Sequence, residues 1–273
     1  MKIFLINLAR NPERLARMGD ILGKSGLAFE RLDAFDGKSL SEDEISRWSQ
    51  RQPDGSLCLS PSEVGCMLSH RNAWEKIAAM DTGHAVVLED DIHMSDDAVT
   101  FLTSGDWIPA DAEIVKIETV KKWKTVVSKK TIPLARDHRL ARLLGQHFGT
   151  GGYIITPAGA RRLLAEIGAV HMAIDQIMFD PASELFHRLS IYQIMPALCI
   201  QDQFMNSSNP VMAGEVVRAW RANRKPKSLV QKAAREGKRF WRQINAAVSG
   251  SRFNPLSRQL NVRVGFRRQA DLG

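Results

Sequence analysis

The amino-acid sequence predicts an α/β fold in which helices pack on a mainly parallel β-sheet. Apolar runs of strand length alternate with amphipathic segments of helical spacing along most of the chain. This alternation is typical of a sheet whose parallel strands are joined by helices. With 273 residues and 44% hydrophobic content, the chain can also bury a substantial core.

The chain begins with a predicted strand and a predicted helix. Residues 2–8, KIFLINL, form a mostly apolar run of strand length. Residues 11–26 place Leu15, Met18 and Leu22 at helical spacing, which indicates an amphipathic helix.

A second strand and a capped helix follow. Residues 29–37, FERLDAFDG, predict a short strand that closes in a turn. Ser41 and Glu44 have the spacing of a capping box, so we expect a helix from there to about Arg51.

The strongest helix signal lies at residues 60–78. Ser60 can cap this helix, Pro61 suits its first position, and Glu63 completes a capping box. Its apolar side chains fall on one stripe, which we expect to pack on the sheet: Val64, Met67, Leu68, Trp74, Ile77 and Ala78. The strand HAVVLEDD, residues 84–91, belongs to that sheet.

Further strands are predicted at residues 113–118, 151–156 and 190–194, with a helix at 157–167 that Thr156 and Pro157 begin. Between them, residues 119–146 are basic and weakly periodic. We interpret that segment as a mobile loop.

The cysteines and the N-terminus bear on the compartment. Cys58, Cys66 and Cys199 form no CxxC pair and no even set, which suits a reducing environment. The N-terminal apolar run is too short for a signal peptide, and no run approaches the roughly 20 apolar residues of a membrane span. We expect a cytoplasmic protein.

Charge divides the chain into two parts. Residues 218–273 hold 15 of the 38 Lys and Arg residues, and the acidic residues in this segment are Glu236 and Asp271. We therefore predict an α/β domain at 1–217 that is mildly acidic, followed by a strongly basic extension at 218–273.

Three consecutive acids, Glu89, Asp90 and Asp91, follow the predicted strand at 84–91. Ligands of open α/β sheets lie at the carboxyl ends of strands, and adjacent carboxylates repel unless a cation joins them. A hard cation, Mg²⁺ or Mn²⁺, would fit and would in turn suggest a diphosphate-bearing substrate. The alternative is a solvated strand end, or Asp91 and Asp96 capping the next helix.

Four blocks occur in a fixed order over about residues 2–180: IFLINLARNPERLARM; FERLDAFDG; SEVGCMLSHRNAWEKI with HAVVLEDDI; and GTGGYIITPAGARRLL with IDQIMF. Together they resemble glycosyltransferase family 25, the lipooligosaccharide glycosyltransferases. The chain departs from the family pattern at Ser62, commonly Gly, and at Ala173-Ile174, often Pro-Val.

The resemblance implies a nucleotide-sugar-binding sandwich of the GT-A type. It also implies a hexosyltransferase that takes a sugar, often galactose, from a UDP-sugar with inversion and passes it to a lipooligosaccharide. Asp91 is then the expected metal ligand on the donor diphosphate. Glu89 is a further ligand or, like Asp90, a donor-site neighbour.

Transfer to an acceptor hydroxyl also needs a base outside the metal cluster. Asp175 is the first candidate and Glu118 the rival. Asp175 can alternatively cap the short helix after it. Gln176 would bond sugar hydroxyls.

Basic and polar residues after the first strand are candidates for the nucleotide site. Asn7, Arg10 and Arg14 follow that strand, and either arginine can bond phosphate or remain solvated.

Ser69 and His70 form a polar pair that is predicted to face the donor pocket, although a lone helical histidine is often structural. Gly151 and Gly152 would let backbone approach a ligand closely, or else form a bulge or turn. The sequence does not choose between His171 and His187 as an additional metal ligand, and His93 is predicted to lie in a loop.

The basic extension contains apolar residues at helical spacing between about Leu229 and Val248, with Phe240 and Trp241 among them. A basic amphipathic helix of this kind suits an anionic membrane surface. We therefore expect a peripheral protein on the cytoplasmic face of the membrane, with a lipid-linked oligosaccharide acceptor. An ordinary packed helix is the alternative, and residues 252–268 are predicted to be less ordered.

Two other functions stay open. The chain is either an enzyme or a noncatalytic nucleotide-sugar-binding protein that keeps the fold. Nucleic-acid binding through the basic extension is the rival class, which the acidic body and the absence of a recognition motif disfavour. The sequence does not predict an oligomeric state.

Overall fold

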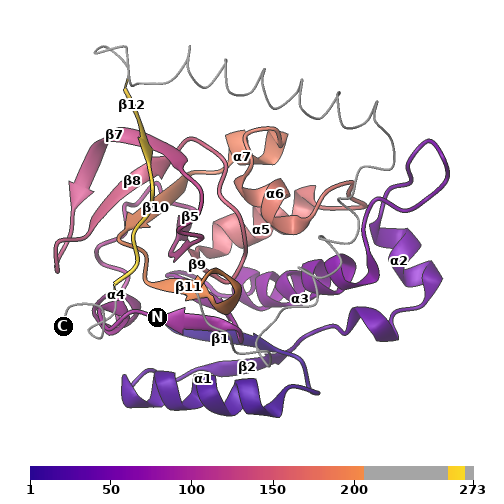
Figure 1. Ribbon diagram of the computed structural model, residues 1–273, viewed down its shortest axis with the longest axis horizontal. Coiled ribbons are helices and arrows are strands. Elements are labelled where there is room, and N and C mark those ends of the chain that lie inside the picture. The colour runs from indigo at the N-terminus through magenta and orange to yellow at the C-terminus, as the bar shows by residue number, and fades with distance from the viewer. Residues whose placement is uncertain (206–257, 268–273) are drawn as a thin grey trace.

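The computed structural model describes residues 1–205 and 258–267 (Figure 1). The predicted amphipathic helix at 229–248 and the proposed domain boundary after residue 217 lie outside these residues. No helix in the described part of the chain is both long enough and apolar enough to cross a bilayer.

A mixed sheet forms the centre of the molecule. Its strands lie in the order β12 (Gln259–Val262), β7 (Thr125–Pro133), β8 (Arg139–Leu143), β10 (Ile191–Met195), β5 (Ile114–Lys116), β9 (Gly152–Ile155), β3 (Ala85–Glu89), β1 (Lys2–Asn7) and β2 (Glu30–Asp33). A second, smaller sheet has the order β4 (Ile92–Met94), β11 (Cys199–Gln201) and β6 (Glu118–Thr119).

The strand directions confirm the α/β prediction with a mainly parallel sheet. β1 is parallel to β2 and β3, and β10 is parallel to β5. β9 lies antiparallel between β3 and β5, and β8 is antiparallel to β10 and β7. As a result β2, β1, β3, β5, β10 and β7 share one direction, so β1 and β3 end at the same edge of the sheet.

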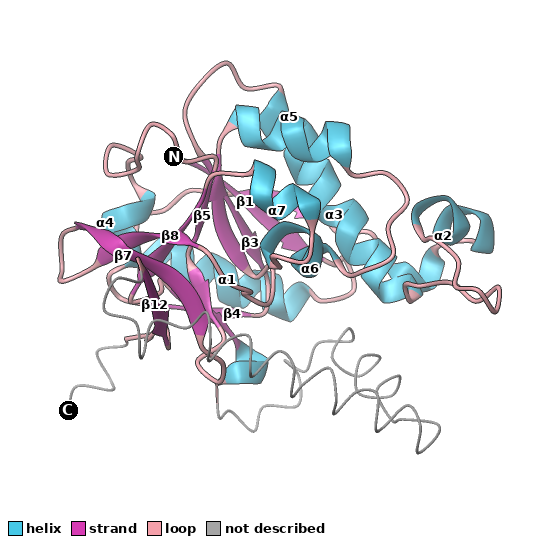
Figure 2. Ribbon diagram, turned by 90° about the horizontal axis from the view of Figure 1, so that it is seen from above, coloured by secondary structure: helices cyan, strands magenta, loops and turns pink. Residues whose placement is uncertain are grey.

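Helices cover both faces of the sheet, as Figures 1 and 2 show. In the described residues the α-helices are α1 (Pro12–Lys24), α2 (Glu42–Trp48), α3 (Pro61–Ala78), α4 (Ala98–Leu102), α5 (Pro157–Glu166), α6 (Ile174–Phe179) and α7 (Glu184–Arg188). α3, α5, α6 and α7 share one core with Phe4 and Ile6 of β1, while α1 and α4 share the other with Ile3 and Leu5. Because successive strand side chains point to opposite faces, β1 contributes to both cores.

The predicted capping boxes are confirmed at both helices. In α2 the hydroxyl of Ser41 accepts the backbone N–H of Glu44, and the Glu44 carboxylate accepts the N–H of Ser41. Ser60 and Glu63 form the same pair of bonds at the start of α3. α3 therefore starts at a fixed residue, which sets the position of the histidine two turns further on.

The basic segment at 119–146 is not the loop that we predicted. Residues 125–133 and 139–143 form β7 and β8, an antiparallel pair with a register shift between Val127 and Thr131. That irregularity interrupts the alternation of apolar and polar residues, which explains why the pattern looked weak. His93 was likewise predicted in a loop but lies in β4.

The prediction of low order for residues 252–268 is wrong for its described part. β12 pairs antiparallel with β7, and Val264 and Phe266 are buried against the body. Phe266 also forms an isolated bridge with Ala197. The apolar residues between the arginines hold this segment on the sheet, so it belongs to the same body as residues 1–205.

A close backbone contact fixes α3 against the turn after β2. A Cβ atom on Gly65 of α3 would lie 2.6 Å from the carbonyl oxygen of Phe35 and 2.8 Å from the backbone nitrogen of Gly37. Ser69 links the same segments, since its hydroxyl accepts the N–H of Phe35 at 2.9 Å and donates to the Gly65 carbonyl at 2.7 Å. The glycine is therefore required by space rather than by backbone conformation.

Gly65→Ala is expected to destabilise the protein by about 1–3 kcal/mol, because the new methyl group meets rigid backbone. Gly23→Ala in α1 is the matched control, since a Cβ there would have nothing within 4 Å. Helix propensity alone should stabilise both variants by roughly 0.5–1 kcal/mol. Urea unfolding followed by circular dichroism compares them, and an equal gain at both sites would refute the close contact.

Candidate active site

The candidate site lies where β1 and β3 end. β3 ends at Glu89, and Asp90 and Asp91 form the turn into β4. In the adjacent strand Ile6 is the register partner of Glu89, so Asn7 is brought beside the acidic turn. This is the edge at which the sequence predicted a ligand.

Glu89 is held by side chains from three segments. Its carboxylate contacts Nε2 of His70 at 3.1 Å and accepts the hydroxyl of Thr150 at 2.6 Å and the amide of Gln201 at 2.9 Å. Burial acts to raise the pKa of Glu89, but the hydrogen bonds from His70 and Thr150 and the charge of Lys116 together lower it. Glu89 is therefore an ionised group with a fixed orientation.

A buried chain of hydrogen bonds orients His70. The indole N–H of Trp74 donates to the hydroxyl oxygen of Tyr153 at 2.8 Å, and that oxygen lies 2.9 Å from Nδ1 of His70. With a proton on Nε2, each group in the series donates to the next, and the series ends on Glu89. This order assigns the tautomer of His70 from its surroundings.

Asp90 is bonded to the segment that follows β1. One carboxylate oxygen accepts the amide of Asn7 at 2.7 Å, and the other accepts Arg14 at 3.2 Å. Burial raises the pKa of Asp90. The hydrogen bonds from Asn7 and Arg14 and the charge of Arg14 oppose this rise but do not cancel it. Asn7 also accepts Arg31 at 3.0 Å, so its amide is used within the protein. Asp90 and Asn7 thus connect α1 to the turn.

The carboxylate of Asp91 has weaker hydrogen bonding than those of Glu89 and Asp90. It is 7% exposed, and the hydrogen bond recorded for its carboxylate is a long one of 3.5 Å from Gln201. Burial and the negative charges of Glu89 and Asp90 raise its pKa well above the usual value. A hard divalent cation prefers carboxylate oxygens and would offset this repulsion, so Asp91 fits the predicted metal.

A second group of charges lies beneath the turn. The ammonium of Lys116 donates to Glu118 at 2.6 Å and to the carbonyl of Gly149, and both side chains are fully buried. The other carboxylate oxygen of Glu118 has no hydrogen-bond partner. Burial raises the pKa of Glu118 to about 7, a rise that Lys116 opposes and the charges of Glu89 and Asp175 reinforce.

Asp175 holds the same glycine segment. Its two oxygens accept the backbone N–H groups of Gly149 and Gln176, each at 2.9 Å. Burial raises its pKa, which these two bonds oppose. Asp175 lies inside the first turn of α6, whose N-cap is Ala173 without a side-chain cap bond, so the alternative that Asp175 caps this helix is wrong. Its side chain stays partly exposed.

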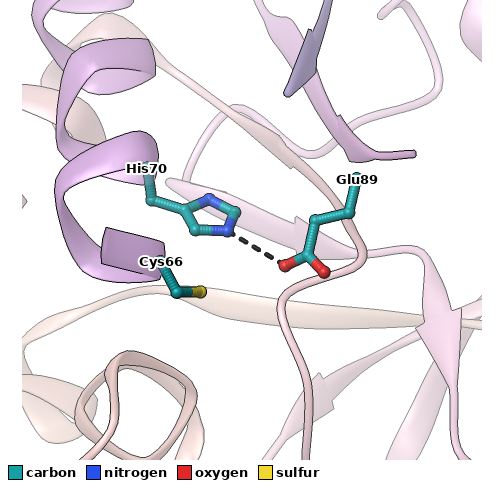
Figure 3. Close-up of side chains that lie close together, drawn as sticks. All are labelled: Cys66, His70 and Glu89. Atoms are coloured by element: carbon teal, nitrogen blue, oxygen red, sulfur yellow. Dashed lines mark hydrogen bonds and ion pairs between the residues drawn. The ribbon is translucent and has the colours of Figure 1, made fainter. Parts of the chain in front are cut away.

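Figure 3 shows Cys66 and His70, both on α3, facing Glu89. The ligand atoms of these three residues lie within 4.8 Å of one another. However, the His70 and Glu89 atoms are already in direct contact, and burial together with the charges of Glu89 and Asp175 raises the pKa of the Cys66 thiol well above its usual value. Because His70 and Glu89 already bond each other, this group is better explained as a hydrogen-bond network.

Several predicted donor-site residues have partners within the protein. Ser69 faces the turn after β2 and not the pocket that we predicted. Arg10 forms an ion pair with Asp36. A Cβ on Gly152 would collide with the sulfur of Cys199, and one on Gly151 would lie 2.7 Å from Cγ of Gln201. These glycines are therefore explained by protein packing rather than by ligand approach.

The candidate residues that follow Asp175 or lie near it in the sequence are more exposed to solvent. The side chain of Gln176 is partly exposed, as its predicted contact with a sugar requires. His171 and His187 are exposed, and Nε2 of His187 lies 2.8 Å from the carbonyl oxygen of Pro181.

The sequence did not identify Thr150, Tyr153, Lys116 or Gln201 as site residues. Thr150 and Tyr153 lie within the GTGGY motif, where only the glycines were singled out. Lys116 lies within a predicted strand. Its spacing of two residues from Glu118, which places both side chains on one face of the strand, is the feature of the sequence that could have identified it. Gln201 carries no local signal, since it reaches Glu89 across 112 positions of sequence.

Glu118→Gln is expected to change how stability depends on pH. The folded protein holds this proton up to about pH 7, whereas the unfolded chain releases it near the ordinary value of 4.5. Between these values the unfolded state binds fewer protons, so wild-type stability falls as pH rises. Relative to wild type, the glutamine variant should gain up to about 3 kcal/mol between pH 5 and pH 8. Urea unfolding at both pH values measures this gain, and a constant difference would contradict the assigned pKa.

Comparison with known proteins places the chain in a family. The family model described as glycosyltransferase family 25 (LPS biosynthesis protein) matches residues 1–178. The chain is 27% identical to lipooligosaccharide biosynthesis protein lex-1 of Haemophilus influenzae, over 70% of this chain and 67% of that protein. It is also 27% identical to the lacto-N-neotetraose biosynthesis glycosyltransferase LgtE of Neisseria gonorrhoeae, over 100% of this chain and 96% of that protein.

A relative named inactive glycosyltransferase 25 family member 3, from Mus musculus, is 29% identical over 66% of this chain and 32% of that protein. The family match covers α3, the acidic turn and Asp175, which are the elements that build the site. The chain therefore belongs to glycosyltransferase family 25, and its role is that of a glycosyltransferase.

Proposed function

We propose that this glycosyltransferase moves a hexose, galactose, from UDP-galactose to a lipooligosaccharide or lipopolysaccharide acceptor, with a divalent cation and with inversion at the sugar carbon. Relatives named for lipooligosaccharide and lacto-N-neotetraose biosynthesis support the acceptor class. A GT-A type of donor binding is what the family resemblance implies.

The observation that carries the proposal is the weakly compensated carboxylate of Asp91. Its carboxylate is buried beside two other acids, and its pKa is raised accordingly. Asp91 would hold Mn²⁺ or Mg²⁺, with Glu89 as a further ligand or as the group that orients Gln201 beside it. When bound, such a cation neutralises charge on a leaving diphosphate as a Lewis acid.

The β1 side of the turn suits the nucleotide and its phosphates. Arg14 lies against Asp90, and Asn7 joins the same network at the carboxyl end of β1. In this proposal Arg14 and Arg10 provide positive charge for the phosphates, and Asn7 and Asp90 fix the position of α1.

Asp175 remains our first candidate for the base that deprotonates the acceptor hydroxyl. Its side chain is partly exposed, and burial raises its pKa towards the working range of a base. The rival, Glu118, is fully buried and bonded to Lys116. A base must contact the hydroxyl that it deprotonates, which favours Asp175.

Asp91→Asn is expected to lower Mn²⁺-stimulated turnover of UDP-galactose at least a hundredfold and to abolish the effect of Mn²⁺ on donor binding. Asp90→Asn is the matched control, because the adjacent acid is bonded to Asn7 and Arg14 and should keep its metal response. Asp175→Asn should lower turnover about a hundredfold while donor binding is retained, since it removes the base and one of the two backbone N–H bonds that Asp175 accepts. UDP release and calorimetric titration with UDP provide the two measurements.

Metal-stimulated turnover that survives in Asp91→Asn would overturn the assignment of the cation. A wild-type chain that binds UDP-sugars but turns none over, with any saccharide acceptor, would favour the noncatalytic alternative. One relative carries the word inactive in its name, so both measurements are needed. A panel of UDP-sugars in the same assay identifies the donor.

We also propose that the protein works in the cytoplasm at the inner face of the membrane, attached through the basic amphipathic segment near residues 229–248. The full chain should float with vesicles that contain phosphatidylglycerol, and not with phosphatidylcholine alone, and salt should weaken this binding. Binding to DNA or RNA with a steep salt dependence, without flotation, would instead support the nucleic-acid alternative.

A further inference from the structure

Three aromatic side chains from separate segments gather beside the candidate site. Trp123, Phe148 and Phe204 form this group, which we call the aromatic shelf. The ring centroids of Trp123 and Phe148 lie 4.8 Å apart, and those of Trp123 and Phe204 lie 6.0 Å apart. The indole is 38% exposed and both phenylalanines are partly exposed, so the shelf presents aromatic surface to solvent.

Each member of the shelf is linked to the chemistry of the site. Phe148 precedes Gly149, whose N–H bonds Asp175. Phe204 ends the short 3₁₀ helix Asp202–Phe204, which directly follows the Gln201 that bonds Glu89. Trp123 lies four residues after β6, the strand that contains Glu118. The shelf therefore flanks the acidic turn on the β6 and β11 side, while Arg14 flanks it on the β1 side.

The turn that presents Trp123 has an unusual backbone. Lys121 has a φ of 40°, in the left-handed region that non-glycine residues rarely occupy. The buried hydroxyl of Thr119 stabilises this turn, since it accepts the N–H of Lys121 at 3.1 Å and donates to the carbonyl of Val264 at 2.8 Å. Such conformations persist where surrounding structure holds them, and they gather at ligand sites.

Polar groups surround the shelf. Trp123 and Phe148 line a shallow, open depression together with Lys124, Gln146 and Thr125, among others. The ammonium of Lys122 lies 5.8 Å from the centroid of the Trp123 ring. Aromatic faces beside amide and ammonium groups match a pyranose, which has an apolar C–H face and a rim of hydroxyls.

We propose that the aromatic shelf binds the terminal pyranose of the acceptor saccharide, with its C–H face stacked on Trp123. This inference rests on the proposed function, because it assigns the acceptor to the β6 and β11 side and the nucleotide to the β1 side. From the shelf, the acceptor hydroxyl would approach the turn next to Gly149 and Asp175. The shelf thus selects for a saccharide acceptor and does not contribute to donor binding.

Saccharide binding to the full-length protein tests the shelf without requiring turnover. Methyl β-galactoside, methyl β-glucoside and lactose are titrated by saturation-transfer NMR, with UDP titrated separately. Trp123→Ala should weaken saccharide binding about tenfold, Trp123→Phe should weaken it less, and UDP binding should be unchanged in both. Ile132→Ala is the matched control, because Ile132 is 37% exposed on β7 outside the shelf.

The proposal is overturned if Trp123→Ala and Phe204→Ala both bind the saccharides as wild type does, or if the wild type binds none of them. Weaker UDP binding in Trp123→Ala with unchanged saccharide binding would show a nucleobase platform instead, and would also overturn it. Thermal unfolding of each variant confirms that it is folded, and Trp123→Phe keeps a ring if alanine is not tolerated.

Failure of the shelf and failure of the proposed function give different results. Sugar transfer with an unchanged KM for the acceptor in Trp123→Ala would retain the function and reject the shelf. Saccharide binding that depends on Trp123, without transfer from any UDP-sugar, would retain the shelf and reject the function.

Discussion

Electrostatic repulsion among three consecutive carboxylates at the end of a buried strand is the constraint on which the site depends. The protein compensates each acid differently. Glu89 is surrounded by donors from α3, the GTGGY segment and β11, and Asp90 is bonded to the segment after β1. Asp91 keeps a raised pKa and a single long hydrogen bond. Two of the three carboxylates have close hydrogen-bond donors within the protein, so the proposed cation would bind at the third, Asp91.

Glu89 also joins the layers of the fold. His70 connects Glu89 to the helix layer, because it lies on α3 and its ring is hydrogen-bonded to Tyr153 of β9. The hydroxyl oxygen of Tyr153 in turn accepts the indole N–H of Trp74, which also lies on α3. Gln201 reaches Glu89 from the second sheet and Thr150 from the segment before β9. Below them, Lys116 bonds both Glu118 and the Gly149 carbonyl, so the glycine segment is fixed by a buried charge. A change in any of these groups alters the orientation of the carboxylates.

The arrangement divides the site into two flanks with different chemistry. The β1 flank offers arginines and an asparagine, which suit phosphate, and the β6 and β11 flank offers aromatic rings with polar neighbours, which suit a saccharide. Asp91 lies in the turn between β3 and β4, and the backbone N–H of Asp202 bonds its carbonyl at 2.8 Å. The donor and the acceptor would therefore meet at the acidic turn, where a transferase requires both.

The sequence by itself determined much of the local structure, although not the strands β4, β7, β8 and β12. The capping boxes at Ser41 and Ser60 depend on bonds between residues three positions apart, and the alternating apolar runs fix strands and helices by their period. It also placed the three acids at the end of a strand. Only the tertiary structure decided which acid is left uncompensated, because Asn7 lies 83 positions from Asp90 and Gln201 lies 112 from Glu89. The pairing of β12 with β7 has the same origin. Such partners are set by the order of strands in the sheets, which local propensity and spacing do not encode.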